Sequence, residues 1–511
     1  MKKIFASICM CAVVLTSCDM DTPAPGVIDD QTAISDIERA YQFRNYIYNN
    51  LRSCTTGSWV YNSDLQMDEF IGLSTNGNRG GLISSGDFTT SADFASGAYN
   101  GMYSRIANAN YLIGHCEKLI AGGALSEEDQ MEIEVFVGEA KFARAFYYFY
   151  LMDHFCQTYD PAKGDVKGLG LSLVTVYDPT PDHSRYPGRS SMNEVLDRIN
   201  TDLNDAYTAF KNFEEEGYTQ FLTAGSHYLS SSAVEALQAR VALVTSDYET
   251  AISKAQSVIA NPNYKLAAGE DYIDMWSDQN VSELIFTPFV DANEAGTISS
   301  TCEGWNYWWS KQTQTDHLPT YTTITRYETA DYRKDAFFKA FYVNVQGGMQ
   351  VAYVMNKYPG NKSLVVSTDL FLNTPKPFRL SEQYLIIAEA AANTNDAKLA
   401  CDALNTLRAA RFDAEDFEEV NLSGEPLIEF VREERARELL GEGFRQSDLR
   451  RWKVAWKRYA QYPIQPAVAK SFVIADINCQ YSADDYRYVW PIPSDEMEIN
   501  PQLKGQQNPG Y

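Results

Sequence analysis

The stretch Glu433-Glu-Arg-Ala-Arg-Glu-Leu-Leu-Gly-Glu-Gly-Phe-Arg445 lies in the C-terminal third of a 511-residue chain and combines charged and apolar residues at helical spacing. It predicts a helix from about Leu427 to Trp452, with Pro426 in the first turn, where proline is well tolerated. The apolar face of this helix comprises Val431, Leu439 and Leu440. We expect that face to pack against other helices.

Charged residues crowd the same helix: Glu434, Arg435, Glu438, Glu442, Arg445 and Asp448. Glu433 and Arg437 stand four positions apart, which predicts an ion pair. We expect Arg435 and Arg445 to bind the helix that contains residues 382–390 through charge-assisted hydrogen bonds. Glu438 and Glu442 also have the spacing of a catalytic carboxylate pair, but acids beside arginines usually form a pairing network, which is the interpretation we prefer.

Four earlier stretches repeat apolar residues three and four positions apart, which indicates amphipathic helices: Ile37–Leu51, Tyr99–Leu119, Ser126–Phe155 and Met192–Phe210. Ser126 opens Ser-Glu-Glu-Asp, which places acids in a first helical turn, where the helix dipole favours them. A helix is therefore predicted to begin near Ser126.

Two segments have the spacing of degenerate tetratricopeptide hairpins. Their small or close-packing positions are Ala388, Ala400 and Leu404 in residues 382–410, and Ala239, Ala251 and Ala255 in residues 233–259. Ordinary helical hairpins explain this spacing nearly as well, and no regular 34-residue array is present.

Three stretches are predicted to be loop-rich inserts between the helices: Trp59–Asp93, Gln157–Arg189 and Ala292–Leu318. The second contains Pro161, Pro179, Pro181 and Pro187, which a helix would not tolerate. Long loops on a rigid scaffold often carry binding residues. The predicted fold is therefore mostly α, with long inserts and little β.

The composition limits the classes of partner. A net charge of -25 disfavours nucleic acid and other polyanions, because their phosphates would be repelled. With 45% hydrophobic and 22% charged residues, the chain should fold. After the N-terminal segment, no stretch approaches the length of a membrane-spanning apolar helix.

The N-terminus reads as an export signal. Met1-Lys2-Lys3 is followed by an apolar run that ends in Leu15-Thr-Ser-Cys18, so residues 1–17 are predicted to be a signal peptide. Leu-Thr-Ser-Cys resembles the lipobox of bacterial lipoproteins, in which the cysteine is acylated, here Cys18. Residues 18–36 would then be a lipidated tether. The alternative is a soluble secreted protein with Cys18 in a disulfide.

Cofactor and catalytic motifs are absent from the sequence. The remaining cysteines, Cys54, Cys116, Cys156, Cys302, Cys401 and Cys479, are scattered without CxxC spacing, so we expect buried free thiols, although one or two disulfides remain compatible with the sequence. There is no HExxH, GxSxG, Walker loop or dinucleotide fingerprint, and the five histidines lack ligand spacing. We expect no metal, no cofactor and no enzymatic activity.

A series of separated motifs carries a family resemblance. They are Arg379-Leu-Ser-Glu-Gln-Tyr-Leu-Ile-Ile-Ala-Glu-Ala390, Asn405-Thr-Leu-Arg408, residues 433–445, Asp448-Leu-Arg-Arg-Trp452, Pro491-Ile-Pro-Ser-Asp-Glu-Met-Glu-Ile-Asn-Pro501 and Asn508-Pro-Gly-Tyr511. Together with the lipobox, their order resembles the SusD/RagB family of Bacteroidetes outer-membrane lipoproteins.

The resemblance implies a SusD-like helical scaffold, with an N-terminal half at residues 37–262 and a C-terminal half at 263–511 packed into the same body. It also implies a glycan-binding lipoprotein on the exterior of the outer membrane that delivers its ligand to a SusC-like TonB-dependent transporter. Asp19 and Asp21, beside the lipidated position, resemble the signal for surface exposure. Two alternatives stay open: a RagB-like protein for peptide uptake, and a glycoside hydrolase, because 68 acids are available.

Candidate ligand residues come from both halves. In residues 303–310, Trp305, Tyr307, Trp308 and Trp309 would form an aromatic ledge for sugar rings, although packing in the core is the alternative for some of them. From the first insert we expect Asn76, Asn78 and Arg79, with Trp59 behind them. SusD-like sequences often have a tryptophan shortly before the Tyr99 helix, and Asp93-Phe-Ala-Ser-Gly97 lacks it. Trp276 is expected to be a packed residue.

Overall fold

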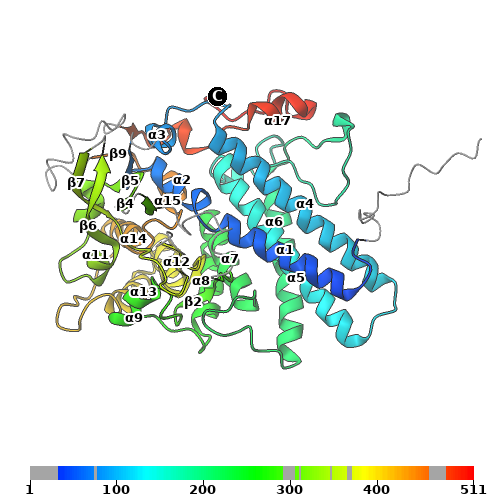
Figure 1. Cartoon of the computed structure of the whole chain (residues 1–511), viewed down its shortest axis with the longest axis horizontal. Coiled ribbons are helices and arrows are strands. Elements are labelled where there is room, and N and C mark those ends of the chain that lie inside the picture. The colour runs from blue at the N-terminus through cyan, green and yellow to red at the C-terminus, as the bar shows by residue number, and fades with distance from the viewer. Residues whose placement is uncertain are drawn as a thin grey trace, which may run out of the picture.

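The computed structural model describes residues 33–73, 78–291, 305–309, 312–345, 348–364, 371–459 and 479–511. Helices dominate these residues (Figure 1), so the predicted mostly α class is confirmed. The N-terminal helices are α1 (Ile37–Cys54), α2 (Ser58–Gln66), α3 (Gly81–Ser85), α4 (Asp93–Ala121), α5 (Glu127–Phe155) and α6 (Met192–Glu215). They are followed by α7 (Ser231–Val244), α8 (Tyr248–Ile259), α9 (Glu270–Met275), α10 (Tyr321–Thr325) and α11 (Tyr332–Phe337). The C-terminal helices are α12 (Leu380–Asn393), α13 (Ala397–Ala409), α14 (Glu425–Glu438), α15 (Arg445–Trp452) and α17 (Ser494–Ile499).

The strands in the described residues form antiparallel pairs. These are β1 (Phe70–Gly72) with β5 (His317–Pro319), β2 (Leu284–Phe286) with β8 (Phe378–Arg379), β3 (Tyr307–Trp309) with β4 (Gln312–Gln314), β6 (Phe338–Val345) with β7 (Gly348–Met355), and β9 (Trp456–Lys457) with β10 (Gln480–Tyr481). The longest pair, β6 with β7, lacks a counterpart in the sequence-based prediction. The β1–β5 pair joins segments more than 200 residues apart, because Phe70 lies opposite Pro319.

The long helices α1, α4, α5 and α6 lie side by side (Figure 1), and α5 contacts the other three. The predicted start of α5 is confirmed, since the Ser126 side chain accepts a hydrogen bond from the Asp129 N–H at 3.1 Å. Ser191 forms a capping box with Glu194 at the start of α6. Helix α4 begins at Asp93, earlier than the predicted Tyr99.

The two predicted alanine-rich hairpins are confirmed as the pairs α7–α8 and α12–α13, and α12 also packs against α8. The six positions named above from their spacing all lie in one buried cluster: Ala239, Ala251, Ala255, Ala388, Ala400 and Leu404. Small side chains at these positions let the helix backbones approach closely.

The predicted single helix over 427–452 is wrong, because it is two helices. Helix α14 ends at Glu438 and α15 begins at Arg445. Gly441 and Gly443 lie between them with φ angles of 72° and 85°, which glycine adopts without the strain of other residues. A Cβ on Gly443 would lie 3.2 Å from the Val60 carbonyl oxygen. The break therefore brings α2 close to the C-terminal motif.

The charged face of α14 forms a buried ion-pair network. Glu438 accepts hydrogen bonds from Arg333 at 3.1 Å, from Arg379 at 3.0 Å and from Arg411 at 2.9 Å. Burial alone would raise the pKa of Glu438, but these arginines outweigh it and hold the pKa well below its usual range. Glu442 is likewise bound by Arg379 and Lys357. The pairing network preferred for these two acids is the arrangement that forms.

Two pairings of that face differ from the prediction. Arg437 pairs with Glu434 at 2.9 Å instead of Glu433, which reaches Arg326 at 3.0 Å. Arg435 does contact α12, through Glu389 at 3.2 Å, whereas Arg445 binds Asp68 at 2.8 Å just after α2. Because Arg445 starts a separate helix after the glycine break, it faces a different neighbour.

The main hydrophobic cluster extends from Ile34 to Leu503. As predicted, Trp276 is packed in it. Cys54, Cys116, Cys156, Cys401 and Cys479 are free thiols, and Cys302 lies outside the described residues. The insert 157–189 contains only short 3₁₀ turns among its helical elements, in line with its prolines, whereas the insert 59–93 is partly helical because α2 and α3 lie within it.

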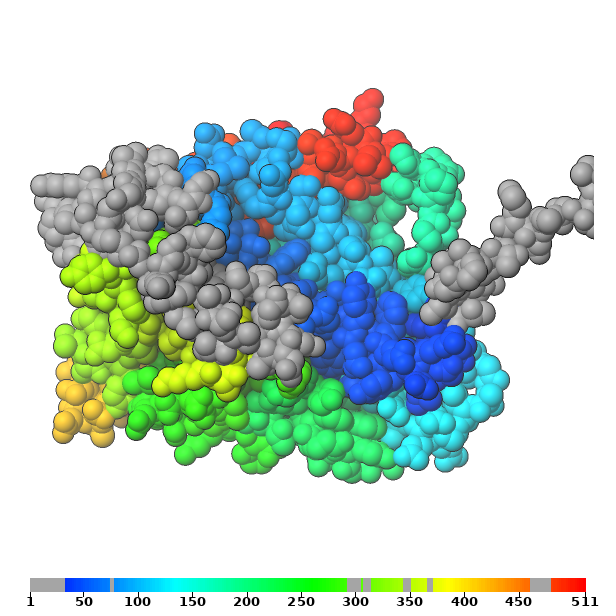
Figure 2. All heavy atoms as spheres, viewed as in Figure 1, coloured from blue at the N-terminus to red at the C-terminus, as the bar shows by residue number. Residues whose placement is uncertain are grey.

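The C-terminal segment closes the body beside the start of α4. The Ser494 N–H donates to the Thr90 carbonyl at 2.9 Å, and Figure 2 shows the red C-terminal residues against the blue N-terminal surface. The Asn508 amide donates to the Phe155 carbonyl at 2.8 Å and accepts from Arg189 at 2.9 Å. These bonds fix the ends of α4 and α5 that border the candidate site.

Candidate functional site

A cleft of about 460 Å³ lies between α2, α3 and the start of α4. Aromatic and polar side chains from distant parts of the sequence line it: Ser58, Trp59, Tyr61, Asn62, Arg79, Asp93, Phe94 and Tyr150. Leu82, Ile83, Gly97 and Ala98 complete its surface. The cleft therefore combines flat rings with hydrogen-bonding groups.

Trp59 is held by contacts on two sides. The Arg105 guanidinium lies 4.5 Å from its ring centroid, and the Tyr150 ring meets it edge-on at 5.9 Å. A Cβ on Gly101 would lie 2.6 Å from the edge of the Trp59 ring, so the glycine lets this ring lie against α4. Trp59 was predicted as a ligand residue, and it lines the cleft.

Tyr61 connects the cleft to the C-terminal half. Its ring lies 5.0 Å from His317 and 5.9 Å from Trp305. Burial, together with the nearby Asp316 carboxylate, raises the pKa of Tyr61, so its hydroxyl remains a hydrogen-bond donor at neutral pH. The same burial lowers the pKa of His317 to about 4, which leaves that imidazole neutral.

The position predicted for Trp305 in an exposed ledge is wrong. Its side chain is only 2% exposed and packs on Phe70 at a centroid distance of 4.1 Å. The β1–β5 pairing holds His317–Pro319 against the N-terminal half, and the Trp305 ring fills the core behind Tyr61. Trp305 therefore supports the cleft wall from within.

Arg79, which the sequence suggests as a ligand residue, lines the cleft, and its side chain is 56% exposed. It pairs with Asp316 at 2.7 Å, so this contact too joins the two halves. Asn78 has a φ angle of 57° and is not among the residues that line the cleft; its side chain instead turns toward Gly81. Asn76 and Cys18 lie outside the described residues.

Tyr307, Trp308 and Trp309 form strand β3, which pairs with β4 so that Trp308 lies opposite Thr313. This hairpin begins two residues after Trp305, whose ring contacts Tyr61. The backbone of the β3–β4 hairpin therefore begins directly behind the wall of the cleft. The role of these three side chains as ligand contacts stays a prediction.

Polar groups in the cleft are available to a ligand. Ser58, Asn62 and Asp93 line it, and their side chains make no hydrogen bond or ion pair to other residues in the described part of the chain. They offer a hydroxyl, an amide and a carboxylate. Such groups, beside aromatic faces, can bind the hydroxyls of a ligand whose apolar faces stack on the rings.

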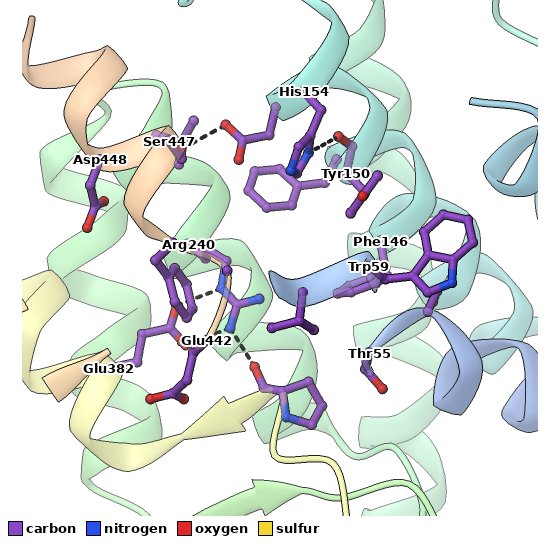
Figure 3. A pocket seen from close by; sticks show the side chains of 18 of the residues that line it. Thr55, Trp59, Phe146, Tyr150, His154, Arg240, Glu382, Glu442, Ser447 and Asp448 are labelled. Carbon is purple, nitrogen blue, oxygen red and sulfur yellow. Dashed lines mark hydrogen bonds and ion pairs between the residues drawn. The ribbon is translucent and has the colours of Figure 1, made fainter. Parts of the chain in front are cut away.

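Trp59 and Tyr150 also line a second, smaller cavity of about 110 Å³ (Figure 3). In Figure 3, Arg240 and Glu382 lie across this cavity from Trp59, Phe146 and Thr55. Its charged groups are paired with protein groups, as in the Arg240–Glu382 bridge at 2.6 Å. The larger cleft, with its unpaired polar groups, is therefore the better candidate site.

The sequence prediction missed Tyr61, Asn62, Phe94 and Tyr150. The helical spacing that presents Ser58, Trp59, Tyr61 and Asn62 together falls at the start of residues 59–93, which the sequence predicts to be loop-rich. The stretch 93–97 lacks a tryptophan, and the Phe94 ring lines the cleft there. Tyr150 belongs to the predicted amphipathic helix 126–155, and nothing in its spacing indicates a cleft.

Among the described residues, no group of three or more His, Cys, Asp or Glu side chains could hold a metal ion. None of the helices over the same residues is long and apolar enough to cross a membrane.

Comparisons with known proteins agree on one family. A family model described as "SusD family" matches residues 201–511, and one described as "Starch-binding associating with outer membrane" matches residues 37–243. SusD-like protein P2 of Formosa agariphila is 24% identical over 489 residues, covering 85% of this chain and 86% of that protein.

Solved structures share the fold. A SusD superfamily protein from Bacteroides thetaiotaomicron has a TM-score of 0.74 at 23% identity, covering 93% of this chain and 100% of its own. A putative sugar binding protein from Bacteroides vulgatus has a TM-score of 0.74 at 24% identity, covering 94% and 100%. A SusD-like carbohydrate binding protein from the same species has a TM-score of 0.69 at 19% identity, covering 92% and 98%.

Proposed function

Because the chain belongs to the SusD family, we propose that it is a cell-surface glycan-binding lipoprotein whose ligand occupies the cleft of Trp59 and Tyr61. Relatives described as sugar-binding or carbohydrate-binding proteins support the class of ligand. The single observation that carries the proposal is the cleft's combination of aromatic rings with a hydroxyl, an amide and a carboxylate that bind no other side chain or backbone group among the described residues. Sugar rings present C–H faces for stacking and hydroxyls for those polar groups.

Membrane attachment and delivery complete the proposal. Acylated Cys18 would anchor the chain in the outer membrane, and a family description that mentions association with the outer membrane supports this location. The bound glycan would pass to a SusC-like TonB-dependent transporter, as the family resemblance implies. No bond needs to be broken in this scheme, and the acids Glu438 and Glu442 are committed to arginines in the core.

Affinity electrophoresis tests this function. The chain from residue 19 would be run through gels that contain a panel of plant, host and microbial polysaccharides. We expect one glycan to retard the protein, and Trp59→Ala to weaken that retention about fivefold, since a stacked ring contributes roughly 1 kcal/mol.

Tyr177→Ala is the matched control, because Tyr177 is a 39% exposed ring on the insert 157–189 and does not line the cleft. Its retention should equal that of the unmodified chain. Free migration through every gel, together with binding of a peptide pool, would replace glycan with peptide as the ligand. Equal retention of both variants would move the site away from the cleft.

A further inference from the structure

A third cavity, of about 200 Å³, lies between α1, α5, the end of α6 and the connection from α6 to α7, and it shares no lining residue with the cleft. Six aromatic side chains line it: Tyr41, Phe136, Phe210, Phe213, Phe221 and Tyr228. On α5, Glu132, Phe136 and Glu139 recur at intervals of three and four, so they face the same side of the helix. The cavity is therefore an aromatic box with carboxylates in its wall.

One cation of the chain itself already occupies part of this box. The Arg44 guanidinium lies 4.8 Å from the Tyr228 ring centroid, 4.9 Å from that of Tyr48 and 5.3 Å from that of Phe136. Glu139 neutralises it through two bonds of 2.6 Å. The rings are thus arranged as a cation–π environment, and Arg44 with Glu139 contributes no net charge.

Arg44 also lies 5.7 Å from the Tyr41 ring centroid, whereas Phe213 and Phe221 pack against other rings. Phe213 stacks on Tyr218 at 4.2 Å with an interplanar angle of 6°, and Phe221 meets Tyr228 at 5.0 Å and 67°. These contacts hold the rings of the α6–α7 connection in fixed positions beside the cavity. An incoming group would therefore meet ordered aromatic faces.

Of the charged side chains that line the cavity, one carboxylate forms no ion pair within the described residues. Glu214 is bound by the Ser231 N–H at 3.0 Å and lies 3.5 Å from the Lys211 ammonium. Glu132 has no ion pair or hydrogen bond to another side chain in the described residues. Its carboxylate lies partly buried beside aromatic rings, and the cation that acts on it, Arg44, is already bound by Glu139.

From this arrangement we propose that the cavity binds an organic cation, an alkylammonium or trimethylammonium group, with Glu132 as its counter-ion. Aromatic faces and one unpaired carboxylate are complementary to a positive charge on an apolar body. A neutral sugar would also stack on the rings, but it would leave the Glu132 charge uncompensated. The proposal does not depend on the glycan cleft.

Titration calorimetry on the chain from residue 19 tests it with choline and with 3,3-dimethyl-1-butanol, which has the same shape without the charge. We expect choline to bind and the neutral alcohol to bind at least tenfold more weakly. Glu132→Gln should weaken choline binding about tenfold, as should Phe221→Ala. Nα-acetyl-lysine methylamide, used as a third probe, would show whether a lysine side chain of a protein partner fits the same site.

Glu127→Gln is the control for charge, because Glu127 is an exposed acid in the first turn of the same helix and does not line the cavity. Trp59→Ala is the control for the cleft. Both should bind choline like the unmodified chain. Equal binding of choline and the alcohol, no binding of any of the cationic probes, or unchanged binding by Glu132→Gln would each overturn the proposal.

Discussion

The carboxylate of Glu438 holds several segments of the chain together. It is fully buried and accepts bonds from Arg333 before β6, from Arg379 at the end of β8 and from Arg411 after α13. Removing a partner from such a group leaves uncompensated buried charge, which usually costs 3–5 kcal/mol. The network therefore ties the C-terminal segments to α14.

Glu438→Gln is accordingly expected to lower the free energy of unfolding by about 3 kcal/mol or more, measured by urea denaturation. Glu433→Gln is the matched control, because the Glu433 side chain is 51% exposed and makes a single pair with Arg326. It should cost less than about 1 kcal/mol. Similar losses for both variants would refute a special role for the buried network.

The break between α14 and α15 positions α2. Because α2 forms one wall of the cleft, the break also positions the cleft. The Gly443 N–H donates to Asp64 on α2 at 2.8 Å, and the Arg445 N–H donates to the same carboxylate at 3.1 Å. A single helix through 439–444 would direct these N–H groups to its own carbonyls. The break therefore couples the C-terminal motif to the helix that carries Trp59.

Gly443→Ala should lower the melting temperature more than Gly505→Ala does. Both glycines have positive φ angles, 85° and 75°, so both substitutions carry backbone strain of about 1 kcal/mol or more. Only at Gly443 would the new Cβ meet backbone, at 3.2 Å from the Val60 carbonyl oxygen, whereas Gly505 has open space. Equal shifts in thermal denaturation would mean that the contact with α2 contributes nothing.

The same element shows what could be predicted from the sequence. The spacing of apolar residues was enough to predict the long helices and the alanine hairpins, because the periodicity of a helix face depends only on residues that are close in sequence. The break at Gly441 and Gly443 was missed, since the apolar period continues through Leu439 and Leu440. For the site, the position of Trp59 and Arg79 in the first insert made them candidates and both line the cleft, but Trp305 was misplaced. Its burial depends on the pairing of β1 with β5, which no local pattern reveals.

Acid stability is a property of the whole molecule. Burial alone would raise the pKa of Glu434, but Arg333, Arg437 and Arg408 outweigh it and lower the pKa to about 2. Arg445 and Arg326 likewise outweigh burial and lower the pKa of Asp68, whereas burial raises the pKa of the adjacent Glu69 to about 7. A carboxylate whose folded pKa lies below its unfolded value stabilises the protein above the unfolded pKa, and this stabilisation is lost as the pH falls toward the folded pKa.

The free energy of unfolding should therefore decrease steeply between pH 4.5 and pH 2, measured by urea denaturation at several pH values. Glu434→Gln should be about 3 kcal/mol less stable at pH 7 and should show a shallower decrease on acidification. Parallel pH profiles for the two proteins would contradict the assignment of this acid sensitivity to the network.

We propose that a glycan binds in the cleft between α2, α3 and α4. Gly97 offers a direct test because it lies in that cleft on α4, and a Cβ there would meet open space. Gly97→Leu would fill the cleft without removing any polar group, and leucine is the better helix former. Gly114→Leu is the control, since Gly114 is also on α4 with open space beside it but outside the cleft.

The most direct measurement is titration calorimetry of these two variants with oligosaccharides of the retained glycan. We expect Gly97→Leu to lose at least tenfold in affinity and Gly114→Leu to bind like the unmodified chain. Undiminished binding by Gly97→Leu, with its fold intact by circular dichroism, would contradict it.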